Sequence, residues 1–488
     1  MIGATLLAAA GASGPSHTVL DFSRWQFAFT AAFHMTFPAL TVGLSVFLCV
    51  IYAVYMRTED PRYLQIYRFW RKIFAVGFAL GVVSGIVLTF EFGLNWGRYA
   101  HDVGPIIGVL IGMEVATAFF LEAGFIGIML YGEGRVSRRI TMFANTMVAL
   151  GTLLSTTWIL DANSWMQTPA GFKRVNGQFE PTDWVNVIFN PSYLHRYFHM
   201  LFAALIAAGW LVAGVSAFYL VRRRHQAFSR RSFSIAIGLL CILLPWQLFI
   251  GDNVGATDTQ YQPYKVFTWE GNYNSDNSGY NLLVVPNPQS GKDLFQITIP
   301  NLDALLGPHD LSGQAQTPGI NMIPKNQRPN VYLVFWGFRA MFYSALAMFA
   351  TVFVGLYLRL RRQLYTSRRF LRWVTWTTPI GVVAIIGGWI VAEAGRQPWV
   401  VYGQLLTGRA VSGLSTGSVV FSFIAFVLIY LVMFTFWVAY VVRQVRRGPD
   451  PIEWVEPDKP ISPNRPRVPL AVPAGNGAPV GAADPVSA

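Results

Sequence analysis

The chain has 488 residues, of which 53% are hydrophobic, 15% aromatic and only 12% charged. Soluble domains carry about a quarter charged residues, so this composition excludes an ordinary soluble enzyme and indicates an integral membrane protein. The net charge of +13 would suit a nucleic-acid-binding protein, but the distribution of the arginines described below argues against that class.

About nine apolar stretches are long enough to cross a bilayer, which takes about 20 residues in a helix. Because lipid offers the backbone no hydrogen-bond partners, each stretch is predicted to be an α-helix. The expected fold is therefore an all-α integral membrane protein. The predicted helices cover residues 25–56, 73–96, 104–131, 141–161, 192–221, 232–251, 331–358, 375–395 and 415–442.

Basic residues gather in alternate connections between these helices, and the intervening short connections contain few of them. The clusters lie in 57–72, 135–139, 222–231, 359–372 and 443–447. This is the positive-inside pattern, which predicts an N-terminus outside and a C-terminus in the cytoplasm. The basic excess is thus a signal of topology, and no nucleic-acid partner is expected.

The chain divides into five predicted regions. They are an external N-terminal segment (1–20), the first six helices (21–251), an external loop (252–330), the last three helices (331–447) and a cytoplasmic tail (448–488). The loop is long and polar, and such loops are usually functional or disordered. The tail is rich in proline and nearly free of aromatic residues, so it is predicted to be disordered. Cys49 and Cys241 both lie in apolar spans, where a disulfide framework is not expected.

Ionisable residues within membrane spans are functional candidates, because a charge in lipid is costly. The candidates are His34, Glu91, Glu114, Glu122, Asp161, His195, His199 and Glu393, with Met341 as a further thioether. Histidine and a His/Met pair are common ligands of haem iron. At 1.5 Å per residue, His34 lies about 15 Å below the outer surface. His199, Met341 and Glu393 are also predicted in the outer half, and this shared depth suggests haem.

Several motifs, in order along the chain, resemble subunit I of the cytochrome bd-type quinol oxidase family. They are "SRWQFAFTAAFH" ending at His34, "GMEVATAFFLE" with Glu114 and Glu122, "WILDANSWMQTP" (158–169), "NPSYLHRYFH" ending at His199, "QPYKVFTWEG" with Lys265 and Glu270, "GFRAM" ending at Met341, and "GRQPW" with Arg396. The resemblance covers about residues 20–447. The external loop lacks the longer insertion found in some family members, and in this it resembles some cyanide-insensitive ones.

The resemblance implies roles for individual residues. His199 and Met341 are implied as the axial ligands of a low-spin haem b, with Arg339 near its propionates. His34, Glu114 and Glu393 are implied as ligands or neighbours of two high-spin haems, one b-type and one either haem d or a further haem b. The metal ligands would thus be His34, His199, Met341 and Glu393, and the cofactor-binding set adds Glu114, Arg339 and Arg396.

The resemblance also implies the reaction. Lys265 and Glu270 would contact quinol at the outer face, O2 would be reduced to water at the high-spin haems, and Glu114 and Glu122 would bring protons from the cytoplasm. The catalytic set would be Glu114, Glu122 and Glu393. Partners would be subunit II, with room for a small single-helix subunit, in the lipid of the bacterial inner membrane.

Two alternatives remain open at this stage. One is a haem electron-transfer subunit without oxygen chemistry, which would need only His199 and Met341. The other is a transporter with buried carboxylates. His195 and Asp161 match no role, and His195 is expected to be structural. Haem d and haem b, and ubiquinol and menaquinol, are not distinguished.

Overall fold

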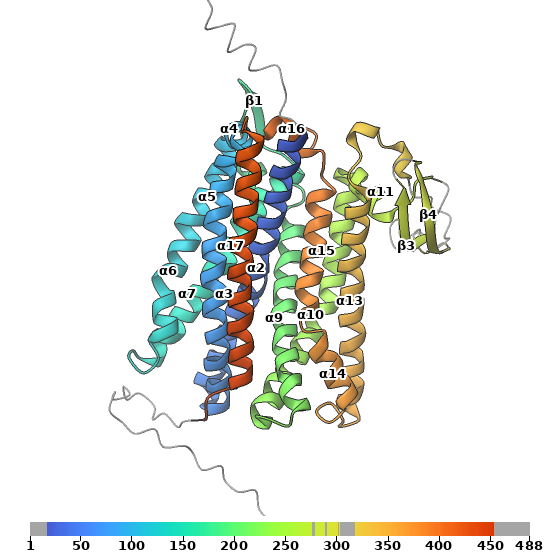
Figure 1. Cartoon of the computed structure of the whole chain (residues 1–488). Helices are drawn as coiled ribbons and strands as arrows, with labels where there is room; N and C mark the ends of the chain where they lie inside the picture. Colours follow the sequence, from blue (N-terminus) through green and yellow to red (C-terminus); the bar gives the residue numbers. More distant parts are fainter. Residues whose placement is uncertain (1–16, 276–278, 288–289, 301, 303–317, 453–488) are drawn as a thin grey trace, which may run out of the picture.

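The computed structural model describes residues 17–275, 279–287, 290–300, 302 and 318–452, and these form a bundle of long helices (Figure 1). Within this described part, nine helical runs are long and apolar enough to cross a membrane, which confirms the predicted all-α membrane fold. Most of the predicted segment 1–20 and most of the predicted tail 448–488 lie outside the described residues.

The long helices are α2 (His17–Thr58), α3 (Pro61–Leu94), α7 (Arg138–Gln167), α9 (Tyr193–Val221), α10 (Gln226–Tyr261), α13 (Val331–Leu360), α15 (Ile380–Ala394) and α17 (Thr416–Arg447). Shorter helices are α8 (Trp184–Ile188), α11 (Pro263–Glu270), α14 (Arg368–Trp376) and α16 (Thr407–Ala410), with 3-10 turns η3 (Ile320–Met322) and η4 (Lys325–Gln327). Polar side chains at several helix starts satisfy free backbone N–H groups. The Asp60 carboxylate, for example, accepts from the N–H of Arg62 at the start of α3.

The third membrane span is not a uniform α-helix. It consists of α4 (Gly97–Val103), the π-helical turn η1 (Gly104–Gly108), α5 (Val109–Glu114), a second π-helical turn η2 (Val115–Phe119) and α6 (Phe120–Tyr131). Each π turn is wider than an α turn and rotates the residues that follow it. The second one lies between Glu114 and Glu122, so their relative direction differs from that in a straight helix.

Several predicted helix boundaries are wrong; the helix predicted over 73–96, for example, begins at Pro61. The helix predicted over 375–395 is interrupted around Pro379, between the end of α14 and the start of α15. Proline has no backbone N–H to donate and its ring clashes with the preceding turn, which explains the break. The predicted loop 252–330 begins with helix, because α10 continues to Tyr261 and α11 follows at once.

Three two-stranded antiparallel hairpins lie between helices. They are β1 (Phe172–Val175) with β2 (Gln178–Pro181), β3 (Tyr280–Asn287) with β4 (Lys292–Ile299), and β5 (Trp399–Val401) with β6 (Leu405–Leu406). Figure 1 places α4, α16, β1 and α11 toward one end of the bundle. We refer to this end as the loop end.

Small residues allow the central helices to approach closely. A Cβ atom on Gly43 of α2 would lie 2.5 Å from the Cβ atom of Ala208 on α9. A Cβ atom on Gly387 of α15 would lie 2.7 Å from the carbonyl oxygen of Gly337 on α13. Close backbone contact of this kind is common where helices associate in membranes. The second contact determines how near Met341 lies to α15.

Candidate functional site

His34 lies at the contact between α2 and α3. Its Nδ1 atom is 3.0 Å from the hydroxyl oxygen of Ser84 on α3. The next residue on α3 is Gly85, and a Cβ atom there would lie 3.0 Å from Cε1 of the imidazole. Ser84 therefore orients the ring, and Gly85 leaves room for it.

His199 has a similar environment on α9. Its Nδ1 atom lies 3.2 Å from the side-chain amide nitrogen of Gln247 on α10. A Cβ atom on Gly251, one turn further along α10, would lie 3.3 Å from Cε1 of the ring. In both His34 and His199, Nδ1 is the ring nitrogen that contacts the protein. The Ser84 hydroxyl can accept from Nδ1–H of His34, which would leave Nε2 for a metal, whereas the Gln247 amide nitrogen can only donate to Nδ1 of His199.

Met341 lies on α13 and faces α15. A Cβ atom on Gly388 of α15 would lie 3.1 Å from the Met341 sulfur. The neighbouring Trp389 has a buried indole N–H with no hydrogen-bond partner among the described residues. Helices α9 and α13 both pack against α10 and α15, so His199 and Met341 lie on two helices with the same neighbours.

These side chains fit haem ligation better than a metal site made of protein alone. No three His, Cys, Asp or Glu side chains in the described part of the chain are placed to share a metal ion. Haem iron needs only one or two protein ligands, because the porphyrin supplies the others. The imidazoles of His34 and His199 and the thioether of Met341 match that requirement.

Glu393, near the end of α15, receives hydrogen bonds from several sides. Its Oε1 atom accepts from the Asn163 amide at 2.8 Å and from the Gln167 amide at 3.3 Å, and both donors lie on α7. Its Oε2 atom is paired with Arg396. The Nε and Nη1 atoms of the buried Arg396 have no partner among the described residues. Such free guanidinium donors suit a carboxylate or a haem propionate.

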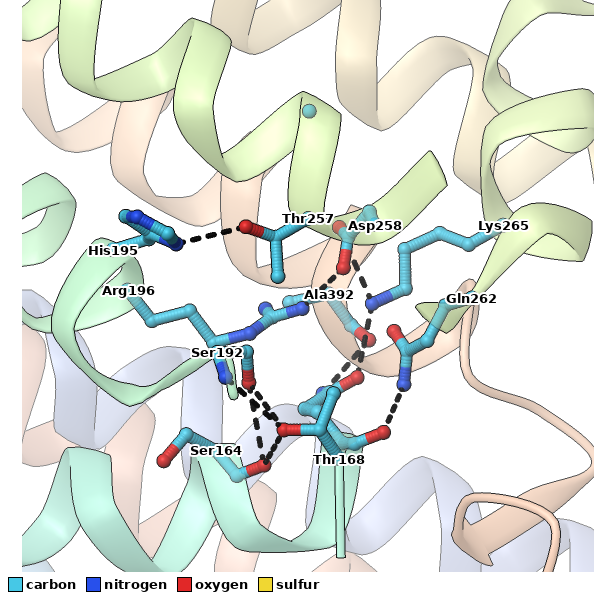
Figure 2. A network of polar contacts seen from close by, with 12 residues as sticks. Ser164, Thr168, Ser192, His195, Arg196, Thr257, Asp258, Gln262, Lys265 and Ala392 are labelled. Carbon is cyan, nitrogen blue, oxygen red and sulfur yellow. Dashed lines mark hydrogen bonds and ion pairs between the residues drawn. The ribbon is translucent and has the colours of Figure 1, made fainter. Parts of the chain in front are cut away.

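Lys265, on α11, is wholly buried in a polar network at the loop end (Figure 2). Its Nζ atom donates to Oε1 of Gln167 at 2.9 Å and lies 3.6 Å from Oδ2 of Asp258. The other oxygen of Asp258 accepts from Arg196 at 2.5 Å. Burial, only partly offset by the Asp258 carboxylate, lowers the pKa of Lys265 to about 7. The amine can therefore gain or lose a proton near neutral pH.

Glu270 is the last residue of α11, and Arg339 lies on the neighbouring helix α13. Glu270 is buried, and its Oε1 atom accepts from the indole N–H of Trp269 at 2.6 Å. Arg339, on α13, donates to the carbonyl oxygens of Trp269 at 3.0 Å and Asn281 at 2.9 Å. These bonds attach α11 and β3 to α13. The role of Arg339 at haem propionates stays a prediction, and the contacts observed here assign its guanidinium to the loop backbone.

Glu114 and Glu122 both face α7. Glu114 accepts from the Ser155 hydroxyl at 2.8 Å. The buried Glu122 packs where Gly151 lacks a side chain, since a Cβ atom on Gly151 would lie 2.5 Å from its Cγ atom. Gly151 and Ser155 are one helical turn apart on α7. In a straight α-helix two residues eight positions apart point about 80° apart; here the π turn η2 lies between Glu114 and Glu122, and both side chains contact α7.

Several residues of this network were not singled out from the sequence. Gln167 and Asn163 lie within the motif 158–169 and share one face of α7, but their partner Glu393 is more than 200 residues away. Arg196 lies within the motif that ends at His199 but was given no role there, and Asp258 lies outside every quoted motif. His195 bonds Thr257 at 2.8 Å, which agrees with the structural role expected for it. Asp161 is fully buried, and its carboxylate has no hydrogen-bond partner among the described residues.

Comparison with known proteins connects this arrangement to one family. A family model described as cytochrome bd terminal oxidase subunit I matches residues 22–449. The chain is 32% identical to cytochrome bd ubiquinol oxidase subunit 1 of Bacillus subtilis, over 88% of this chain and 94% of that protein. It is 30% identical to cytochrome bd-II ubiquinol oxidase subunit 1 of Escherichia coli, over 90% and 98%. Among solved structures, bd oxidase from Geobacillus thermodenitrificans matches with a TM-score of 0.82 and 25% identity, over 89% of this chain and 99% of that one.

Proposed function

The chain belongs to the family of cytochrome bd terminal oxidase subunit I, and from this premise we propose that it oxidises quinol beside Lys265 and reduces O2 to water at haems held between its helices. As a family member it is a multi-pass protein of the bacterial inner membrane and a quinol:oxygen oxidoreductase. The main support for the proposal is the buried Lys265. Its ammonium group donates to the side-chain amide of Gln167, and the same amide donates to Glu393.

The haem-binding side chains would fall into two groups. His199 and Met341 would hold the low-spin haem b, which fits their oriented ring nitrogen and the glycine opposite the sulfur. His34, Glu393 and Glu114 would serve the two high-spin haems, with the free donors of Arg396 available to propionates. Bound haem iron supplies one-electron transfer and the site at which O2 is reduced.

At the quinol site, the chain's own residues handle charge and protons. Lys265 can donate to a quinol or quinone oxygen, and Asp258 and Gln167 keep its amine in place. Quinol gives up two electrons and two protons when it becomes quinone. A lysine whose pKa is lowered to about 7 can, in its neutral form, accept the proton that a quinol hydroxyl loses and then release it. Glu270, on the same short helix, would be the second quinol contact.

Protons for water formation would come from the opposite side of the membrane. Glu122 would receive them and pass them to Glu114 by way of the polar face of α7 at Ser155. The N-terminus and α11 would lie outside and the C-terminus in the cytoplasm, as the arginine distribution predicts. Quinol oxidation outside and proton uptake inside would then separate charge without a pump. The proposed assembly also contains subunit II and can include a small single-helix subunit.

Replacing Lys265 with Met tests the quinol site. Loss of a charged hydrogen-bond donor should lower kcat/KM for quinol by roughly tenfold to a hundredfold. Haem content and the oxidation of a small artificial reductant should change much less, because the haem ligands are untouched. Lys292→Met is the matched control, since Lys292 is an exposed lysine on β4 of the same external segment. Equal losses with quinol and with the artificial reductant would show that Lys265 is only structural.

A further inference from the structure

Gln167 has every polar atom of its side-chain amide occupied. Oε1 accepts from Lys265 at 2.9 Å. Nε2 donates to Oε1 of Glu393 at 3.3 Å and to the carbonyl oxygen of Ala392 at 3.2 Å. The residue is fully buried at the end of α7. The amide can adopt only one orientation here, because its oxygen must face the ammonium and its NH2 group must face the carboxylate.

This amide is the direct connection between two sites that the proposed function keeps separate. Lys265 belongs to the quinol site on α11, and Glu393 belongs to the high-spin haem site at the end of α15. An amide whose oxygen accepts from an ammonium is polarised and becomes a stronger donor through its nitrogen. When quinone or quinol draws the Lys265 amine toward itself, the Gln167 amide loses part of that polarisation, and its hydrogen bond to Glu393 weakens.

We propose that Gln167 is a positioning residue that transmits occupancy of the quinol site to Glu393. The inference rests on the proposed function, because it takes Lys265 as a quinol contact and Glu393 as a residue of the haem site. Coupling between two sites is reciprocal, so the state of the Glu393 site would also change the affinity for quinone. The coupling needs no movement of helices, since Lys265, Gln167 and Glu393 already form a continuous chain.

The test is an equilibrium titration of the oxidised enzyme with a short-chain quinone analogue. Quinone affinity is measured by calorimetry, and the absorption of the high-spin haems is recorded in parallel. In the wild type, saturation with quinone should shift the high-spin bands. Gln167→Met keeps the length of the side chain but removes all three of its side-chain hydrogen bonds. It should still bind quinone, with affinity changed by less than about tenfold, because Asp258 still holds Lys265. The spectral shift at saturation should be lost.

Thr168→Val is the matched control. Thr168 is the next buried residue at the same helix end and bonds Asn190 at 2.9 Å and Ser192 at 2.8 Å, so its replacement disturbs the packing without touching Lys265 or Glu393. The shift should persist in this variant. Gln167→Asn, which shortens the bridge by one methylene, gives a second variant if Gln167→Met does not fold, and it too should lose the shift.

Each result decides between the two proposals. Absence of a shift in the wild type, a full shift in a Gln167 variant at saturation, or equal loss in Thr168→Val would overturn the coupling. Wild-type quinone affinity in Lys265→Met would instead overturn the quinol site itself. Reduced affinity in Lys265→Met together with a full shift in Gln167→Met would leave the quinol site standing and reject only the coupling.

Discussion

Replacing His199 with Ala should remove the absorption of the low-spin haem and with it quinol-driven oxygen uptake. Loss of an outer-shell partner of a metal ligand already costs roughly 10- to 100-fold in metal affinity or activity, and loss of the ligand itself should cost more. The ring is held through Nδ1 by Gln247, and Gly251 leaves room beside it. The high-spin bands should persist at least in part, because His34 lies on other helices. The reduced-minus-oxidised visible spectrum measures both.

His195→Ala is the control for this experiment. His195 lies one turn before His199 on α9, and its ring is engaged by Thr257. This variant should keep the low-spin band, although it loses one side-chain hydrogen bond. An unchanged low-spin band in His199→Ala would show that another residue holds this haem. Equal loss in both variants would indicate that the start of α9 had unfolded.

Replacing Glu122 with Gln should slow turnover and reduce proton uptake. The substitution keeps the shape of the side chain, which fits against Gly151, but removes its titrating group. A positioned proton-transfer group contributes at least about a hundredfold, so turnover should fall by roughly tenfold to a hundredfold if water partly substitutes. Reduction of the low-spin haem by quinol should stay fast, because it precedes the proton step. Stopped-flow reduction and pH changes in reconstituted vesicles separate the two effects.

Glu91→Gln provides the matched comparison. Glu91, on α3, is also a fully buried carboxylate, and it faces Thr30 and Gln26 of α2. The same substitution there should leave turnover and proton uptake close to those of the wild type. Undiminished turnover with normal charge separation in Glu122→Gln would reject this route and leave Glu122 a structural residue.

Much of the fold could be predicted because the membrane imposes simple rules on the sequence. Apolar length predicted the nine spans, and the resemblance to the cytochrome bd family is confirmed by the family match over residues 22–449. The break at Pro379 was readable in principle but was overlooked within a strongly apolar stretch. The π turn Val115–Phe119 could not be predicted from the sequence, because the segment contains no helix-breaking residue and the turn packs against α7.

The candidate site could be predicted only as far as its separate residues. His34, His199, Met341 and Glu393 were found because polar side chains are rare in membrane spans. Their surroundings were not found, because a single sequence does not show which distant side chains meet. The role of Gln167 depends on Lys265, 98 residues away, and on Glu393, 226 residues away. Arg339 was given a haem role by resemblance, whereas its observed bonds go to the backbone of α11 and β3.

We propose that this chain holds one low-spin haem and two high-spin haems and reduces O2 at the high-spin pair. The most direct test is the reduced-minus-oxidised visible spectrum of the protein purified with subunit II. We expect a low-spin b-type band together with high-spin bands that respond to O2 or carbon monoxide. The position of the high-spin bands would distinguish haem d from haem b. A spectrum with no haem bands, or with the low-spin band alone, would contradict the account and favour a transporter or a simple electron-transfer subunit.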